Sequence, residues 1–132
     1  MRQANGVNQD YFEMRVDHGA GTDADVTRYV LKAERAMVID SVDILSEAGV
    51  TANASNFVNI KLVKGASTVV ANWSTETGQE GTMTAATFHD MTMTATAADA
   101  RLAVGDTLKL FCDESGTYNI TAGTAVIRGR YL

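Results

Sequence analysis

The chain has 132 residues, of which 45% are hydrophobic and 20% charged, a composition typical of one folded domain rather than a disordered segment. Its formal net charge of -5 argues against a surface that binds nucleic acid or an anionic membrane. A single cysteine, Cys112, excludes an internal disulfide and a thiolate metal cluster, and residues 1–14 lack the apolar core of a signal peptide. We therefore expect a soluble protein made in a reducing cytosol.

An alternation of apolar and polar residues dominates the chain and predicts strands, because successive side chains of a strand point to opposite faces. In chain order, the predicted strands cover residues 10–16, 27–33, 36–45, 57–63, 67–74, 90–97, 105–112 and 124–132. The turn Lys64–Gly65–Ala66 predicts a hairpin between the fourth and fifth of these strands. A short helix is predicted within residues 97–103.

Two of these segments predict which side chains face the core. Residues 90–97 alternate strictly between threonine and Met91, Met93 or alanine, which predicts one continuous strand with an apolar face. On residues 105–112, Cys112 shares a face with two leucines, where a cysteine is an inert part of the core.

About eight short strands, joined by turns rich in Gly, Asn and Ser, predict an all-β fold. We predict an antiparallel two-sheet sandwich with jelly-roll-like connections between its strands. In this interpretation residues 1–12 form an extended N-terminal arm and residues 13–132 form a single β-sandwich domain.

The sequence specifies no reaction, and we predict neither enzymatic activity nor a cofactor or metal. His89 and Asp90 with Cys112 would make a nucleophile set only if the thiol left the core face and met a base. The acidic residues Asp17, Asp23 and Asp25 are oxygen donors suited to calcium. Their loop, residues 17–25, lacks the ligand order and final glutamate of a calcium-binding loop, so we expect a solvated acidic loop.

The sequence also gives only weak signals for glycosylation and for sugar binding. Glycosylation sequons begin at Asn53, Asn72 and Asn119, but without a signal peptide we expect them to be unmodified. Trp73 with Tyr118 is the one aromatic pair that would offer a platform for a sugar.

Arginine and aromatic residues, which are common interface anchors, gather towards both ends of the chain. The predicted subunit-interface residues are Arg2, Tyr11, Phe12, Arg15, Arg128, Arg130 and Tyr131. Arg128 and Arg130 share one face of the last strand, and two interpretations stay open for them. Either they keep an edge strand soluble, or they meet acidic groups of another chain, with Gly129 allowing a close approach.

The whole chain resembles the small decoration (cement) proteins of tailed-bacteriophage capsids. The resemblance rests on its size, the lack of proline and of a disulfide, the segment VGDTLKLFC at 104–112 and the segment GTAVIRGRYL at 123–132. It implies a jelly-roll-like sandwich that forms a homotrimer, binds the major capsid protein on the outside of the head and clamps neighbouring subunits. The protein would be made in the host bacterial cytoplasm and reside in the virion.

Two other functions remain open at this point. One is a different phage structural component, such as a head-fibre base, a collar protein or a tail protein. The other is a small carbohydrate-binding module, which would display an aromatic platform on its surface.

Overall fold

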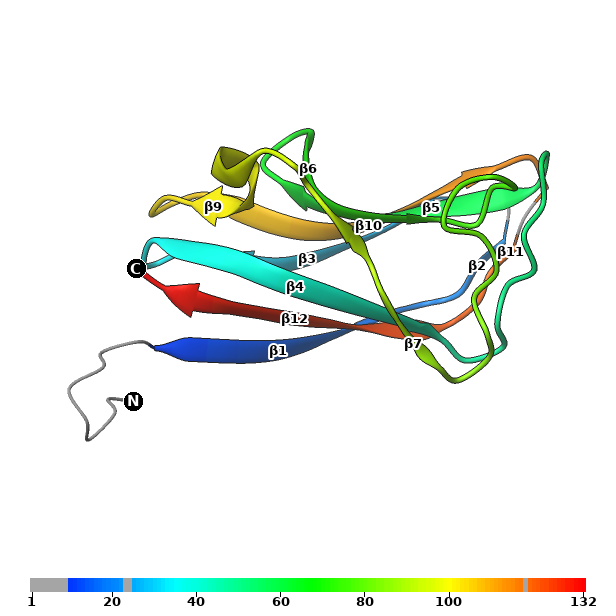
Figure 1. Cartoon of the computed structure of the whole chain (residues 1–132), viewed down its shortest axis with the longest axis horizontal. Helices are drawn as coiled ribbons and strands as arrows, with labels where there is room; N and C mark the ends of the chain where they lie inside the picture. The colour runs from blue at the N-terminus through cyan, green and yellow to red at the C-terminus, as the bar shows by residue number, and fades with distance from the viewer. Residues whose placement is uncertain (1–9, 23–24, 118) are drawn as a thin grey trace.

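The strands form two antiparallel sheets packed face to face in a computed structural model that describes residues 10–22, 25–117 and 119–132 (Figure 1). The β12 sheet has the order β1 (Tyr11–His18), β12 (Gly123–Tyr131), β4 (Met37–Ser46) and β7 (Phe88–Asp90), and β9 (Arg101–Leu102) also pairs with β4. The β10 sheet has the order β3 (Val26–Lys32), β10 (Thr107–Ser115), β5 (Phe57–Lys64), β6 (Thr68–Ser74) and β8 (Thr92–Met93). A small third ladder joins β2 (Gly21–Thr22) to β11 (Asn119–Ile120).

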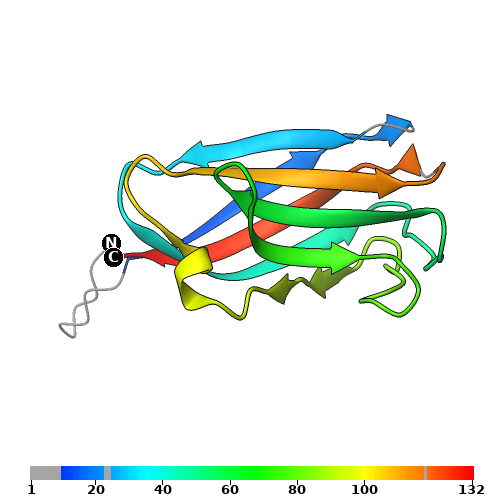
Figure 2. The ribbon, with the colours of Figure 1, turned by 90° about the horizontal axis from the view of Figure 1, so that it is seen from above.

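The principal strands pair in nested order. β1 pairs with β12, β3 with β10, β4 with β7 and β5 with β6, as if one long hairpin were rolled across both sheets. In Figure 2, β10 (orange) lies between β3 (light blue) and β5 (green), in front of the strands of the β12 sheet. This nesting is the jelly-roll arrangement. The predicted antiparallel sandwich with jelly-roll connections is therefore confirmed.

The core lies between the two sheets and is built by the alternation seen in the sequence. On β10, Leu108, Leu110 and Cys112 are each at most 1% exposed, while the residues between them are half-buried on the outer face. On β12, Ala125 and Ile127 are fully buried. The hairpin predicted at Gly65 is also present, because β5 ends at Lys64 and β6 begins at Thr68.

A β-bulge resets the alternation in the middle of β4. Arg128 of β12 faces Ser41, whereas the next residue, Gly129, faces Ile39, so Asp40 has no direct partner on β12. Asp40 and Ser41 both turn away from the core as a result, and the strand returns to inward-facing apolar residues at Val42. Two consecutive polar residues inside an apolar strand were the sequence signal for this bulge.

The single strand predicted over residues 90–97 is wrong. The segment divides into β7, which pairs with β4 in one sheet, and β8, which pairs with β6 in the other. Met91, which lies between them, is buried, and its N–H donates to Val42 in the β12 sheet at 2.8 Å. The segment crosses the side of the sandwich, so its methionines point inward while its backbone changes sheets. The predicted short helix corresponds to the 3₁₀ turn Ala97–Ala100.

The N-terminal arm was predicted to end at residue 12. In the structure β1 begins at Tyr11, so Tyr11 and Phe12 are strand residues that pair with Arg130 and Gly129. Residues 1–9, including Arg2, lie outside the described residues. Within the part of the chain that the structure describes, no helix is long and apolar enough to cross a membrane.

Candidate functional site

A row of charged side chains crosses the outer face of the β12 sheet. Arg128 at its centre donates from Nε to Glu13 on β1 at 3.0 Å and from Nη1 to Asp43 on β4 at 2.7 Å. Asp90 on β7 stands directly opposite Asp43, which extends the row to a fourth strand. The guanidinium therefore bridges carboxylates on both neighbouring strands of its own chain.

The two aspartates of this row share a hydrogen bond. The bond to Asp90 and the contact with Arg128 lower the pKa of Asp43, whereas the bond to Asp43 and its negative charge raise the pKa of Asp90. Because two carboxylates this close repel each other when both are ionised, the outer member of the pair retains its proton to a higher pH. Asp43, held by Arg128, is the member that ionises first.

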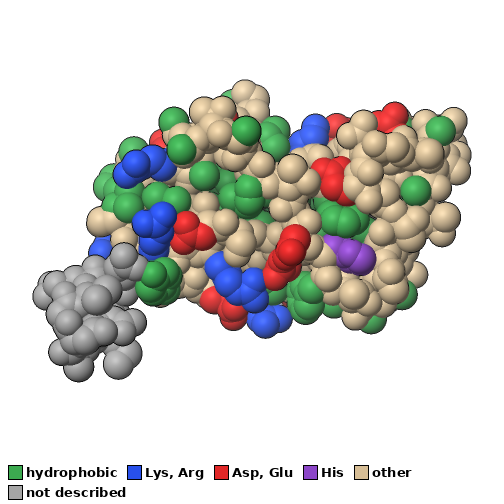
Figure 3. Space-filling model, in the orientation of Figure 1, with side chains coloured by type: hydrophobic (Ala, Val, Ile, Leu, Met, Phe, Trp, Pro, Cys, Tyr) green, Lys and Arg blue, Asp and Glu red, His purple; other side chains and the backbone are tan. Residues whose placement is uncertain are grey.

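Two further arginines of the predicted interface, Arg130 and Arg15, also have partners within the chain. Arg130 contacts both carboxylate oxygens of Asp40, the bulge residue, at 3.3 Å. The guanidinium of Arg15 on β1 lies 6.0 Å from the ring centroid of Phe88 on β7. On the side of the molecule that Figure 3 shows, acidic and basic side chains lie interspersed. A role of these residues in contacts between subunits stays a prediction.

Phe12 and Tyr131 pack against each other on the inner side of β1 and β12, with ring centroids 5.1 Å apart. Gly129 makes room for this pair, because a Cβ atom there would lie 2.6 Å from Cζ of Phe12 and would also meet the carbonyl oxygen of Val38. The close neighbour that Gly129 accommodates is thus within the same chain. Arg35 closes the cluster by stacking 4.4 Å from the centroid of Tyr131.

The nucleophile set considered from the sequence does not have a reactive thiol. Cys112 is fully buried, and burial raises the pKa of its thiol to about 12. The imidazole of His89 accepts a hydrogen bond at Nε2 from the N–H of Thr84 at 3.0 Å and stacks on Trp73. These contacts give His89 a structural role at the side of the sandwich.

We expect Cys112 to be unreactive towards thiol reagents in the folded protein, because the thiolate is the reactive species and the side chain has no access to solvent. Treatment with a chromogenic disulfide reagent should label no thiol in buffer and one thiol per chain in denaturant. Fast labelling of the native protein would contradict the burial of this residue.

The acidic loop and the aromatic pair were the other candidate sites considered from the sequence. Asp17 accepts a hydrogen bond from Thr124 Oγ1 at 2.7 Å, and Asp25 accepts one from the N–H of Glu114 at 3.0 Å. Asp23 lies outside the described residues, and within those residues no group of three potential metal ligands gathers. Trp73 is 9% exposed, and its Nε1–H donates to Gly81 at 3.2 Å, so it is a core residue.

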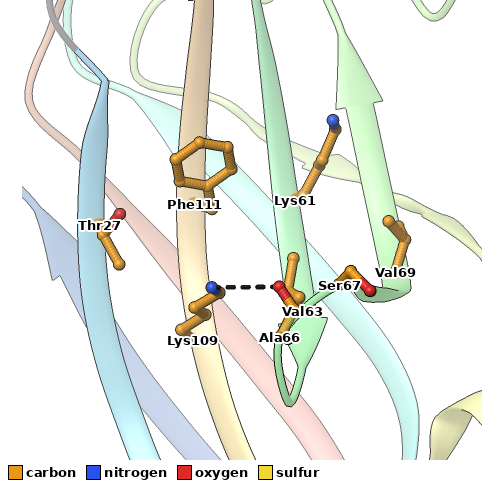
Figure 4. Close-up of a pocket in the computed structure, with 8 residues that line it drawn as sticks. All are labelled: Thr27, Lys61, Val63, Ala66, Ser67, Val69, Lys109 and Phe111. Carbon is orange, nitrogen blue, oxygen red and sulfur yellow. Dashed lines mark hydrogen bonds between the residues drawn. The ribbon is translucent and has the colours of Figure 1, made fainter.

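The outer face of the β10 sheet carries a different pattern. Two neighbouring rows of side chains cross four strands, and together we name them the β10 face. The first row is Tyr29, Lys109, Val63 and Val69, and the second row is Thr27, Phe111, Lys61 and Asn72. A depression of about 310 Å³ lies among them, as Figure 4 shows, with Phe111 between Thr27 and Lys61. The sequence signal was the pair Lys109 and Phe111, which alternates with buried leucines.

His18, at the end of β1, is buried with one ring nitrogen unused. It is 3% exposed, its Nδ1 lies 3.4 Å from the carbonyl oxygen of Gly19, and within the described part of the chain its Nε2 has no hydrogen-bond partner. Burial lowers the pKa of His18 below its ordinary 6.5, since a charged imidazolium would lose its hydration there. The folded protein therefore holds His18 neutral.

Acidification is expected to destabilise the fold through His18. Below about pH 6.5 the unfolded chain is protonated at His18, whereas the folded chain is not. The free energy of unfolding therefore falls by up to about 1.4 kcal/mol for each unit by which the pH drops, until the pH reaches the lowered pKa of His18 in the folded protein. Urea titrations at a series of pH values should show this loss in the original chain and a smaller loss in His18→Gln. An equal loss in both proteins would contradict the assignment.

The architecture defines a jelly-roll β-sandwich, and comparisons with known proteins add little beyond it. No family model matches the chain, and no curated protein matches it. Among solved structures, a chain from the structure of infectious bursal disease virus Gx strain is similar with a TM-score of 0.34 and 10% sequence identity. The similarity covers 93% of this chain and 30% of that chain, so the protein described here spans under a third of its length.

Proposed function

We propose that the chain is a structural protein of a virus particle, and specifically a decoration protein that binds the outside of a tailed-phage head. The observation that carries this proposal is the jelly-roll order of the two sheets, an arrangement that recurs in viral capsid domains and in lectins. The resemblance of residues 104–112 and 123–132 to decoration proteins favours a role in a virus particle over a role as a lectin. Trp73 supports the same choice, because it lies in the core instead of forming a platform for sugars.

The protein would act as a clamp whose effect is thermodynamic. A ligand that binds only the assembled lattice of the major capsid protein stabilises that lattice by mass action. A homotrimer that holds several subunits at once gains further affinity, because its second and third contacts form at high effective concentration. Threefold symmetry would let one trimer occupy a threefold position of the lattice with three identical contacts.

Heat release of DNA tests this clamp directly. Heads stripped of the chain should open at a lower temperature than complete heads, and adding back the purified protein should restore the higher temperature in a saturable way. Dye-detected DNA release during heating measures both. Complete and stripped heads that open at the same temperature would remove the clamping role.

A further inference from the structure

The two outer faces of the sandwich differ in what a partner would have to displace. On the β12 sheet, Arg128 and Arg130 already contact carboxylates of their own chain at 2.7 to 3.3 Å. A partner that covers this face would take satisfied ion pairs out of water, and the desolvation cost offsets most of what new contacts return. The β12 sheet is therefore the less favourable docking surface.

The β10 face offers exposed apolar area instead. Tyr29 is 77% exposed and Val69 is 36% exposed, on opposite sides of the face. Val63 between them is only 4% exposed, so it forms part of the floor of the depression beside the half-buried ring of Phe111. Covering these apolar side chains removes apolar surface from water, which favours association.

Two lysines give this apolar face a positive charge. Within the described residues Lys109 has no carboxylate partner, and its Nζ donates to the carbonyl oxygen of Ala66 at 3.4 Å (Figure 4). Lys61 lies 3.5 Å from Asp113, and both side chains of this pair are partly exposed. An exposed ion pair at this distance is weak, so the ammonium groups of both lysines can bind a carboxylate of another molecule.

We propose that the β10 face docks an acidic segment of a partner protein, one that places an apolar side chain in the depression and carboxylates beside Lys61 and Lys109. The depression, at about 310 Å³, lies at the low end of the sizes of ligand pockets, which suits one or two side chains. The inference rests on the proposed function for the identity of the partner, which would be a capsid subunit. The charge complementarity itself comes from the face alone.

A peptide titration of the isolated chain tests the surface. The probe is the blocked peptide acetyl-EELEE-amide, added to millimolar concentration and followed by the backbone amide signals of the ¹⁵N-labelled protein. Shifts should be confined to the strands that form the β10 face, namely β3, β10, β5 and β6, and to the β5–β6 turn. Lys109→Glu should weaken binding about tenfold, since one charge-assisted contact is worth about that factor. The matched control Arg101→Glu makes the same change of charge off the face and should bind as the original chain does.

Several outcomes would overturn the proposal. They are an absence of shifts at millimolar peptide, shifts that lie elsewhere, equal binding of the cationic peptide acetyl-KKLKK-amide, or equal weakening by Arg101→Glu. Concentration-dependent self-association that Lys109→Glu abolishes would assign the face to a second copy of the chain and would also overturn it. The amide spectrum of each variant shows at once whether that variant is folded.

The same variants separate this inference from the proposed function. If the chain binds heads and both Lys109→Glu and Arg101→Glu bind them equally well, the β10 face is not the docking surface and the decoration role stands. If the chain binds the peptide through the β10 face and never sediments with heads, the docking surface stands and the decoration role fails.

Discussion

Gly129→Ala is expected to lower the free energy of unfolding by about 3 kcal/mol, the upper end of the usual cost of overpacking. The added methyl group would meet the carbonyl oxygen of Val38 on the paired strand and the ring of Phe12. The ring can turn aside, but the carbonyl belongs to the β12–β4 ladder and moves only with the backbone. Urea denaturation followed by Trp73 fluorescence measures the change.

Gly19→Ala is the control for this substitution. A Cβ atom at Gly19 would meet Nη2 of Arg28 at 2.9 Å, the far end of a flexible side chain that can move away at little cost. Phe12→Leu combined with Gly129→Ala should recover only the part of the loss that comes from the ring. A loss for Gly129→Ala no larger than that for Gly19→Ala would mean that β12 and β4 do not approach as described.

Leu110→Ala is expected to have the largest effect, a loss of about 4 kcal/mol in the free energy of unfolding. Leu110 is 1% exposed on β10, an inner strand of its sheet that lies between β3 and β5, and it faces Leu62 on β5. Truncation removes buried apolar surface and leaves a cavity that the surrounding sheet can fill only in part. Val104→Ala, at a residue that is 69% exposed, should cost less than about 0.5 kcal/mol. Similar denaturation midpoints for the two variants would contradict the described core.

The strand pattern made most of this fold predictable. Leu108, Leu110 and Cys112 alternate with Lys109 and Phe111, so the inner and outer faces of β10 follow from spacing alone. The same reasoning failed for residues 90–97, because a strict alternation is equally compatible with a segment that passes from one sheet to the other. Periodicity reports which side chains point inward and says nothing about which strand supplies the hydrogen bonds.

The contact surfaces were harder to predict, for a related reason. The sequence places Arg128 and Arg130 on one face, but their carboxylate partners come from β1 and from the bulge of β4. Those partners depend on the register between strands that are far apart in the sequence, and the local residue pattern does not encode that register. The β10 face was missed because its members are dispersed over four strands, each of which supplies only one pair of them, such as Lys109 and Phe111 on β10.

The most direct test of the central claim, that the protein works as a brace between other subunits, is the sedimentation of the chain from the cells or particles that contain it. We predict that it is recovered with megadalton particles in many copies per particle, and that the complex forms again when purified chain is mixed with stripped heads. A lone 14.1 kDa species that never joins such particles would contradict the claim.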